Sequence, residues 1–251
     1  MGVKKKCYEV KINLGGFTAS TNAVDSLELA EKLKDKLGSK VIIKKIEKKE
    51  VITIPDLPFD LSELQSECNT FFNYNDKQTL EYAQSLFKKN LITNPVTNSR
   101  YLPPNLIIIM INNFLGKYDF DTSRLKVVFN NTKAFGDFAI VPSLNGLDYD
   151  ISALSSNESN VYHLIVDKLH ASVGYPKAEE YKRITLVYEM QDNIIEFEGN
   201  TKEIIDEGFA KYLIKYQADN KDACISLPDI NIGDVLEIKN KKIEEITASI
   251  Q

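Results

Sequence analysis

Residues 58–93 read PFDLSELQSECNTFFNYNDKQTLEYAQSLFKKNLIT, and this stretch decides the class of fold. Ser62 and Gln65 have the spacing of a capping box, so a helix is expected to begin there. Asp76 opens a second helical pattern that runs to the apolar Leu-Ile-Thr. Helices joined by so short a loop predict a compact helical block. The inner side of the second helix is expected to carry Leu80, Ala83 and Phe87.

The helical block continues beyond this stretch. Pro103 and Pro104 fit the first turn of a third helix, NLIIIMINNFLG at residues 105–116. KVVF at residues 126–129 has the composition of a strand, and FAIVP at residues 138–142 is apolar. We therefore expect a short strand after the third helix, within an otherwise helical region.

The N-terminal segment has the pattern of a small α+β unit. Residues 8–14 alternate apolar and polar side chains, which is the period of a half-buried strand. Gly15-Gly16 can supply the positive backbone angles of a tight hairpin turn, and residues 17–20 start the return strand. A helix over residues 25–38 follows. Two further strands are expected, KVIIKKI at residues 40–46 and EVITI at residues 50–54.

The C-terminal third returns to strands after a fourth helix. This amphipathic helix is predicted to be capped near Ser159 and to end at Gly174. The order of β-rich, helical and β-rich segments predicts an α+β fold. We expect a β-rich arch formed by residues 1–56 and 176–251 and a helical domain over residues 57–175. The predicted strands of the last segment are residues 183–190, 194–199, 223–227 and 235–239.

Composition and charge exclude several classes of protein. The 251 residues are 43% hydrophobic and 27% charged, which suits a water-soluble globular chain with a real core. The longest apolar run is far short of the roughly 20 residues that a membrane helix needs, and MGVKKKCYEV lacks the apolar part of a secretory signal. The net charge of −5 argues mildly against tight, autonomous nucleic-acid binding.

The cysteines and histidines predict neither disulfides nor a metal site. Cys7, Cys68 and Cys224 lie far apart in the sequence without a CxxC pair, which favours reduced thiols and a cytoplasmic protein. His163 and His170 are seven residues apart on one helix face, so two turns, about 10 Å, separate them. That separation is too large for one metal ion, and we expect a surface or packing pair.

Five segments, in order along the chain, carry a resemblance to a known family. They are residues 58–93, NNTKAFGDFAIVPS at 130–143, VYHLIVDKLHASV at 161–173, IIEFEGNTKEIIDEGFAKYL at 194–213 and LPDINIGDVLEI at 227–238. Together they resemble the central region of type IA DNA topoisomerases. The resemblance implies a helical, winged-helix (CAP-like) active-site domain attached to a β-rich gate arch. It also implies an isomerase activity, in which a tyrosine cuts one DNA strand and another strand passes through the gap.

The resemblance also shows what this sequence lacks. The family's active-site stretch reads Leu-Ile-Thr-Tyr-(Pro or Met)-Arg-Thr-Asp-Ser, and residues 91–99 here read LITNPVTNS. Asn94 stands at the position of the nucleophilic tyrosine, Val96 at that of an arginine and Asn98 at that of an aspartate. Asp137 falls where the family carries a histidine. A carboxamide cannot form a phosphodiester with a DNA end, so we predict no catalytic residue in this chain.

Further positions differ from the family, and its metal-binding part has no counterpart. The Arg-Arg pair of the family's later helix is replaced by Asp167-Lys168, which removes positive charge. The family uses magnesium through an acidic, Toprim-type domain, and no DxD-type carboxylate cluster occurs before residue 60. We therefore expect no cofactor in this chain and no metal site.

A few side chains near the altered stretch remain candidates for DNA contact. Arg100 is either a phosphate contact or part of a surface ion pair, and Lys77 either touches a phosphate or lies on a solvated helix face. Thr97 and Ser99 either contact DNA or cap and turn the chain. Tyr101 has a nucleophilic hydroxyl, but no basic group that would activate it is evident in the sequence, so packing is expected.

Three hypotheses for function follow. The first is a topoisomerase-like chain that handles or binds single-stranded DNA weakly and does not cleave it. The second is a subunit or piece of a larger topoisomerase, whose catalytic groups come from a Toprim-containing chain or domain. The third is a protein-interaction module without DNA binding, which the negative net charge favours. The sequence leaves open whether the chain is a whole gene product or part of a longer one, and it predicts no membrane partner.

Overall fold

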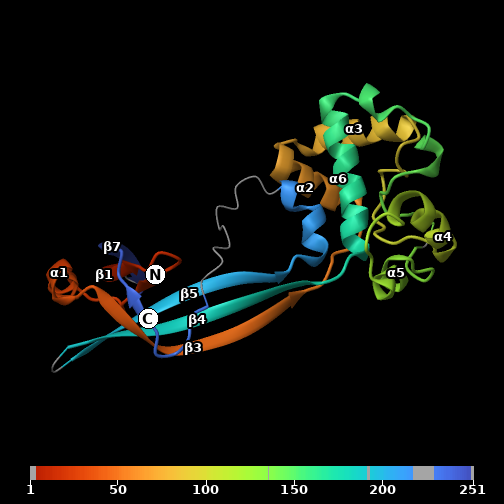
Figure 1. Cartoon of the computed structure of the whole chain (residues 1–251). Coiled ribbons are helices and arrows are strands. Elements are labelled where there is room, and N and C mark those ends of the chain that lie inside the picture. Colours follow the sequence, from red (N-terminus) through yellow and green to blue (C-terminus); the bar gives the residue numbers. More distant parts are fainter. Residues whose placement is uncertain (1–3, 135, 191–192, 217–228, 250–251) are drawn as a thin grey trace. The chain divides into compact units, whose positions relative to one another are not determined.

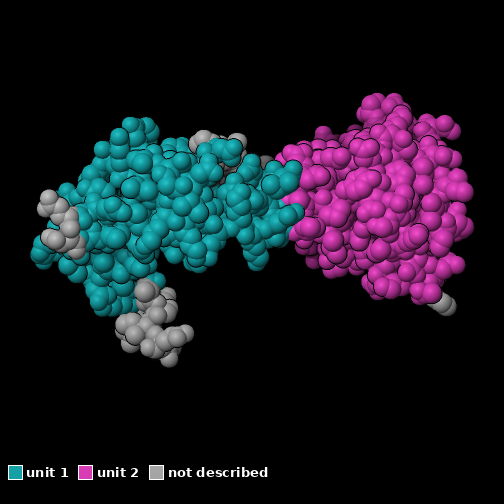
Figure 2. Space-filling view, turned by 60° about the horizontal axis from the view of Figure 1, so that its bottom comes forward, with its two compact units in different colours: residues 1–51, 179–205, 222–251 teal, residues 52–178, 206–221 magenta. Residues whose placement is uncertain are grey.

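The computed structural model describes residues 4–134, 136–190, 193–216 and 229–249. The chain divides into two compact units, which Figure 2 shows in teal and magenta. The strand unit comprises residues 1–51, 179–205 and 222–251, and the helical unit comprises residues 52–178 and 206–221. The predicted strand at residues 223–227 lies outside the described residues.

The described strands form one mixed-length sheet in the order β6-β3-β4-β5-β2-β1-β7 (Figure 1). β1 and β7 pair antiparallel along their whole length, from Lys4 opposite Ser249 to Asn13 opposite Asn240. Strands from both ends of the sequence therefore belong to one sheet. The strands are β1 (Lys4–Asn13), β2 (Thr18–Ser20), β3 (Lys40–Thr53), β4 (Lys177–Glu189), β5 (Ile194–Asp206), β6 (Val235–Glu237) and β7 (Asn240–Ser249).

The predicted N-terminal hairpin is confirmed. β1 and β2 are antiparallel, with Asn13 opposite Thr18, and the Leu14 N–H donates to the Phe17 carbonyl at 2.9 Å. Gly15 has φ +90°, a conformation that L side chains rarely adopt. Gly15 thus supplies the positive backbone angle of the turn, whereas Gly16 does not have a positive φ.

The prediction of two strands between residues 40 and 54 was wrong. β3 is a single strand of 14 residues. Its charged middle stays extended within the sheet, where β3 lies between β6 and β4. The exposed side chains there pair with each other and with β4: Lys45 pairs with Glu47 at 2.6 Å, and Lys48 pairs with Glu180 of β4 at 3.5 Å. The basic KKIEKK run is therefore a set of exposed ion pairs on a strand.

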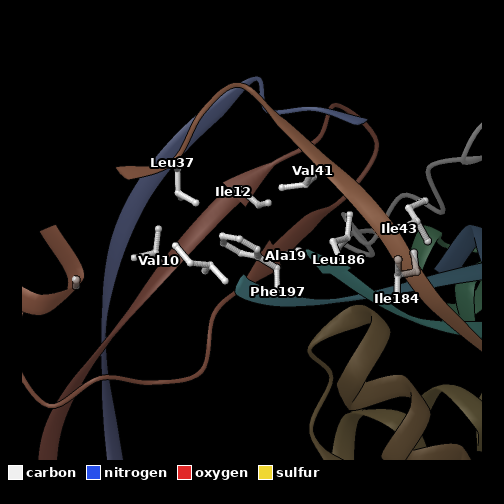
Figure 3. Packing of buried hydrophobic residues seen from close by; sticks show 11 residues of the cluster. Val10, Ile12, Ala19, Leu37, Val41, Ile43, Ile184, Leu186 and Phe197 are labelled. Carbon is white, nitrogen blue, oxygen red and sulfur yellow. The ribbon is translucent and has the colours of Figure 1, made fainter. Parts of the chain in front are cut away.

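The core of the strand unit lies between the sheet and helix α1 (Leu27–Lys36). Ser26 caps this helix by accepting from the Leu29 N–H at 3.3 Å. Figure 3 shows buried side chains that come from the strands and from the end of the helix. The cluster contains Val10, Ile12, Ala19, Ala30, Leu37, Val41, Ile43, Ile184, Leu186, Ile195 and Phe197.

The helical unit is built from short helices around one long helix, α6 (Figure 1). Its α-helices are α2 (Leu61–Phe72), α3 (Asp76–Lys88), α4 (Ile107–Met110), α5 (Thr122–Val128) and α6 (Ser156–Val173). Its 3-10 turns are η1 (Pro104–Leu106), η3 (Leu144–Gly146), η4 (Ile151–Ala153), η5 (Gly208–Tyr212) and η6 (Ile214–Tyr216), and η2 (Ile111–Leu115) is a π turn.

The N-caps of α2 and α6 lie two and four residues before the predicted ones. α2 is capped by Asp60, whose carboxylate accepts from the Glu63 N–H at 2.8 Å, rather than by Ser62. α6 begins before Ser159, because Ser155 and Glu158 form a reciprocal capping box. In both cases an acceptor nearer the N-terminus satisfies the free N–H groups of the first turn.

Two further predictions in this unit were wrong. Residues 126–128 form the last turn of α5, and Phe129 makes only an isolated bridge with Leu102. Asp121 caps this helix, and Leu125 and Val128 bury one side of it. On α3 the buried side chains are Thr79, Ala83 and Leu86, whereas Phe87 is exposed. Residues 126–129 were assigned to a strand, and Phe87 was assigned to the inner face of α3. Both assignments failed because the sequence alone does not show which neighbour covers a helix.

The helical unit has two apolar cores, and α6 contributes to both. One contains Phe59, Leu64, Cys68, Ala83, Leu86, Leu91, Ile92, Ile140, Val161, Leu164 and Ile165. The other contains Leu102, Met110, Leu115, Leu125, Val128, Phe129, Ala139, Val141, Leu169 and Val173.

The segment after β5 belongs to the helical unit, although the predicted division placed it in the arch. η5 packs against α6, the Phe209 N–H donates to the Tyr175 carbonyl at 2.8 Å, and the Tyr212 hydroxyl donates to the Asp119 carbonyl at 3.2 Å. Gly208, with φ +49°, lies so close to the carbonyl of Pro176 that a side chain there would clash with it. Close packing on the end of α6 thus fixes this segment.

Candidate functional site

The loop of residues 91–102 is held at both ends by backbone bridges. Ile92 pairs with Pro142 and Leu102 pairs with Phe129. The Thr93 hydroxyl donates to the Ala139 carbonyl at 2.7 Å and accepts from the Val141 N–H at 3.0 Å. The apolar segment predicted at residues 138–142 is therefore the frame on which this loop rests.

Asn94 lies on the surface of this loop. Its side-chain oxygen accepts a hydrogen bond from the Val96 N–H at 3.0 Å, which closes a tight Asx turn around the buried Pro95. The amide thus takes part in shaping its own loop. It has no hydroxyl or thiol, so this side chain cannot serve as an oxygen or sulfur nucleophile.

Among the next four residues, exposed side chains alternate with side chains that are hydrogen-bonded within the loop. Val96 is 55% exposed, and Asn98 is also exposed. Thr97 is buried: its hydroxyl accepts from the Ser99 N–H at 3.0 Å, and its carbonyl accepts from the N–H of Leu61, the first residue of α2. The Ser99 hydroxyl accepts from the Tyr101 N–H at 3.3 Å. Both hydroxyl groups that were DNA-contact candidates therefore have partners in their own loop.

Arg100 is tied to the chain itself. Its guanidinium donates to the carbonyls of Pro58 and Leu57 at 2.9 and 3.0 Å and to the Asp56 carboxylate at 2.7 Å. Glu63 lies 3.9 Å away, and the side chain is only 20% exposed. Of the two expectations for Arg100, the geometry therefore matches the ion pair.

Arg100 is one of three cations that hold the connector of residues 55–58. Arg124 donates to the Pro55 carbonyl at 2.8 Å, and Lys168 lies 3.7 Å from Asp56 while it also pairs with Glu67. We call the connector and its three cations the connector clamp. Lys168 is almost fully buried and packs over the Phe59 ring at 4.8 Å.

The charges of the connector clamp shift the protonation of its carboxylate and its guanidinium. Partial burial acts to raise the pKa of Asp56, but the hydrogen bonds from Arg100 and the Leu57 N–H and the charge of Lys168 together hold it below its usual range. Burial lowers the pKa of Arg124, although Asp121 and Asp56 oppose this. In the clamp, Arg100 and Lys168 are therefore paired with carboxylates, while Arg124 donates to backbone carbonyls.

Lys77 lies in the first turn of α3, whereas the loop leaves the last turn of that helix. Eleven residues separate Lys77 from Lys88, which corresponds to about 16 Å along a helix. The Lys77 side chain is 86% exposed and only 3.8 Å from Glu81. This arrangement matches a solvated helix face. Lys77 and the loop lie at opposite ends of α3.

A basic neighbour of Tyr101 was missed by the sequence analysis. The Lys133 ammonium donates to the Tyr101 hydroxyl at 3.3 Å and lies 5.0 Å from the centre of its ring. The two residues are 32 positions apart in the sequence, so no local pattern predicts this contact. Asp137 is exposed in the same segment as Lys133, next to the partly exposed Phe138.

The two histidines have separate structural partners. The His163 ring nitrogen contacts the carbonyl and hydroxyl of Ser159 one turn earlier. His170 is buried: its Nε2 bonds the Phe114 carbonyl at 2.8 Å, and its ring lies 4.1 Å from that of Tyr118. Burial lowers the pKa of His170. Neither residue has the environment of a metal ligand in a shared site.

The family's magnesium does not fit the side chains at hand. Among the residues that the structure describes, no three His, Cys, Asp or Glu side chains are grouped so that they could hold a metal ion. Asp56 and Glu67 are already paired with Arg100 and Lys168. Within the described part of the chain, no helix is long and apolar enough to cross a membrane.

Comparisons with known proteins agree with the architecture. A family model described as DNA topoisomerase matches residues 3–250. DNA topoisomerase 3 of Vibrio cholerae is 28% identical over 202 residues, which are 75% of this chain and 30% of that protein. DNA topoisomerase 1 of Methanocaldococcus jannaschii is 26% identical over 235 residues, 90% of this chain and 28% of that protein.

A solved structure shares the fold. Full-length topoisomerase I from Thermotoga maritima aligns with 99% of this chain and 42% of its own, with a TM-score of 0.70 and 19% sequence identity. The α+β fold predicted from the sequence is confirmed by this match. This chain spans about a third or less of the length of the curated relatives named above. The family match over almost the whole sequence shows that the chain belongs to the DNA topoisomerases, as a domain of the type IA kind.

Proposed function

We propose that this chain binds a single DNA strand without cutting it. The observation that carries the proposal is Asn94, which stands in an intact loop at the position where the family resemblance puts a tyrosine. The loop backbone is pinned to residues 139–142, and the Asn94 amide is bonded to the Val96 N–H. Strand cleavage by this family forms a tyrosyl phosphodiester, and a carboxamide has no group that can form one.

The surroundings of Asn94 also lack a group that would stabilise a reacting phosphate. Val96, at the family's arginine position, is apolar and exposed. Arg100 is bonded to Asp56 and to two backbone carbonyls, so its charge is already compensated. Asp137 brings a negative charge into the segment that faces the loop. Removing a single donor to a developing oxyanion commonly lowers a rate about 10²–10³-fold, so these changes together leave little catalysis.

Family membership and the chemistry of the two loops support strand binding. The segments of residues 94–102 and 130–139 are joined by hydrogen bonds from the Ala139 N–H to the Tyr101 carbonyl and from the Asn130 N–H to the Leu102 carbonyl. Many of their side chains are amides or hydroxyls, and few are charged. Such groups bind a strand weakly, so we expect a dissociation constant on the order of 10⁻⁶ M or weaker and a preference for single-stranded over duplex DNA.

A titration and a denaturing gel test this function. Labelled oligothymidylate and its duplex form are titrated with the protein at low salt, and the same mixtures with magnesium are denatured and separated. We expect micromolar binding of the single strand, weaker binding of the duplex and no covalent protein–DNA species. A covalent species would contradict the absence of cleavage. No detectable binding of either DNA would contradict strand binding and favour the protein-interaction hypothesis.

A second candidate function is that of a subunit that works with a Toprim-containing chain or domain. It is favoured by the short span of the match, which covers about a third or less of each relative named above. Its weakness is that the tyrosine of the family would have to lie in the loop of Asn94. Relaxation of supercoiled DNA by a mixture of this chain with a Toprim-containing fragment, but by neither alone, would support this candidate over the first.

A further inference from the structure

Tyr101 and Lys133 are brought together by two loops whose backbones are bonded to each other. The Tyr101 carbonyl accepts from the Ala139 N–H at 3.0 Å, and the Asn130 N–H donates to the Leu102 carbonyl at 2.8 Å. Asn130 starts a closed turn: its own carbonyl accepts from the N–H of Lys133 at 3.2 Å. The position of Lys133 relative to Tyr101 is therefore set by the fold and does not depend on their mutual contact alone.

The pair presents two kinds of hydrogen-bond donor close to each other. The Lys133 ammonium lies 3.3 Å from the Tyr101 hydroxyl and donates one of its three N–H groups to it. The phenol then accepts through its oxygen, and its own proton has no acceptor among the residues that the structure describes. One phosphate group can accept from both donors, because its oxygens carry several lone pairs and a full negative charge.

The charge of Lys133 is the one that the loops leave uncompensated. Within the described parts of residues 94–101 and 130–138, the other cation is Arg100, which is bonded to Asp56. Lys133 has no carboxylate within ion-pairing distance among the described residues, although Asp137 follows it in sequence by four residues. A cation of this kind loses no internal partner when it binds an anion, so its contact costs less than one made by Arg100.

We propose that the hydroxyl of Tyr101 and the ammonium of Lys133 form a contact site for a backbone phosphate of a single DNA strand. This inference rests on the proposed function and names the residues that would carry it. It replaces Arg100 and Lys77 as the expected DNA contacts, because Arg100 has internal partners and Lys77 lies at the opposite end of α3 from the loop. The contact is non-covalent, and it requires no cofactor.

Three variants of the full chain test the site, with an oligothymidylate of about 12 nucleotides as the probe. Lys133→Gln removes the charge, and Tyr101→Phe removes only the hydroxyl. Lys77→Gln is the matched control, because it removes the same charge from another exposed lysine of the helical unit. Lys133→Gln is expected to weaken binding about tenfold and Tyr101→Phe about threefold, whereas Lys77→Gln should change the affinity by less than about twofold.

The salt dependence gives a second readout that separates charge from packing. On a single strand, each lysine–phosphate contact contributes a slope of about −0.7 to the plot of log affinity against log salt. Lys133→Gln should therefore flatten the slope by about 0.7, and Tyr101→Phe should leave it unchanged. Inorganic phosphate added at constant ionic strength, at about 1 mM, should not displace the oligonucleotide if a strand is the ligand.

Each outcome bears on a different statement. If the wild-type chain binds the strand and Lys133→Gln binds equally well, the contact site is wrong while the proposed function stands. Equal losses in Lys133→Gln and Lys77→Gln would show a general effect of net charge and overturn the site as well. Displacement by inorganic phosphate would reduce the pair to a general anion site and contradict the inference. If the wild-type chain binds no strand, the proposed function itself fails.

Discussion

The connector clamp and the contact of Lys133 with Tyr101 differ in what their cations are bonded to. In the connector clamp, Arg100 and Lys168 are largely buried and bonded to carboxylates and carbonyls of the same chain. In the pair of Lys133 and Tyr101, the lysine donates to the phenol and keeps further N–H donors free. The first group stabilises the fold, and the second remains able to bind a ligand. Partners in three dimensions, rather than proximity to a motif, decide which cation is free.

The largest effect is expected at the buried end of the connector clamp. Lys168→Met leaves Glu67 without its cation in a mostly buried position, where one Glu67 carboxylate oxygen already has no hydrogen-bond partner. Breaking such a pair commonly costs about 3 kcal/mol or more. We expect the free energy of unfolding of the helical unit, measured with urea, to fall by about this amount.

The matched control for that substitution is Lys215→Met. Lys215 of η6 pairs at 2.7 Å with Asp167, which lies in α6 next to Lys168. The Lys215 side chain is 56% exposed, and exposed pairs contribute about 0–1 kcal/mol. If both substitutions had the same effect, burial would not be the property that distinguishes the clamp from surface pairs.

A second effect concerns Lys89, a further cation near the loop that has an internal partner. Lys89 and the hydroxyls of Ser85 and Ser155 bond the Glu158 carboxylate, and these bonds lower the pKa of Glu158 to about 2. Because the folded pKa lies below the ordinary value of 4.5, the stabilisation is present above pH 4.5 and is lost as the pH falls toward 2.

Glu158→Gln sharpens this comparison through its pH profile. At neutral pH the substitution should lower stability by about 2 kcal/mol, because hydrogen bonds to a charged group are stronger than neutral ones. The difference in Tm between the variant and the wild type should shrink as the pH is lowered from about 4.5 to 2. A difference that stays constant over this range would show that the charge of Glu158 contributes nothing. Ser85→Ala, which removes one of the bonds, should give a smaller change with the same pH dependence.

The smallest effect is expected when the nucleophile alone is restored. Asn94→Tyr supplies a phenol but leaves Val96 in place of an arginine and Arg100 bonded to Asp56. We expect no covalent protein–DNA species from this variant with magnesium on a denaturing gel, because each missing phosphate donor costs about 10²–10³ in rate. An adduct would show that the other changes are harmless, and the double variant with Tyr101→Phe would identify which phenol had reacted.

Patterns of local sequence predicted much of the fold. The alternation of residues 8–14 with Gly15-Gly16 predicted the first hairpin, and Gly174 was rightly placed at the end of α6. The charged middle of β3 was wrongly treated as a break, because the ion pair of Lys48 with Glu180 joins residues 132 positions apart. Residues 126–129 were wrongly assigned to a strand for a related reason, since a short apolar run looks the same in either structure.

The candidate site was only partly readable from the sequence. Of the two alternatives for Thr97 and Ser99, DNA contact or a turn of the chain, the local hydrogen bonds of both hydroxyls match the turn. The contact of Tyr101 with Lys133 and the three cations on the connector join segments far apart in the chain. No short-range pattern encodes such contacts, so the sequence suggested Arg100 and Lys77 as DNA contacts, whereas our proposal names Lys133.

One paired measurement tests most directly the claim that bonding partners separate structural cations from a ligand-binding one. The oligothymidylate affinity of Lys133→Gln and of Arg100→Gln is measured over a series of salt concentrations, together with the Tm of each variant. Lys133→Gln should flatten the salt slope by about 0.7 with an unchanged Tm, and Arg100→Gln should lower the Tm and leave the slope of the folded protein unchanged. The reverse pattern, a flattened slope for Arg100→Gln and an unaltered one for Lys133→Gln, would contradict the account.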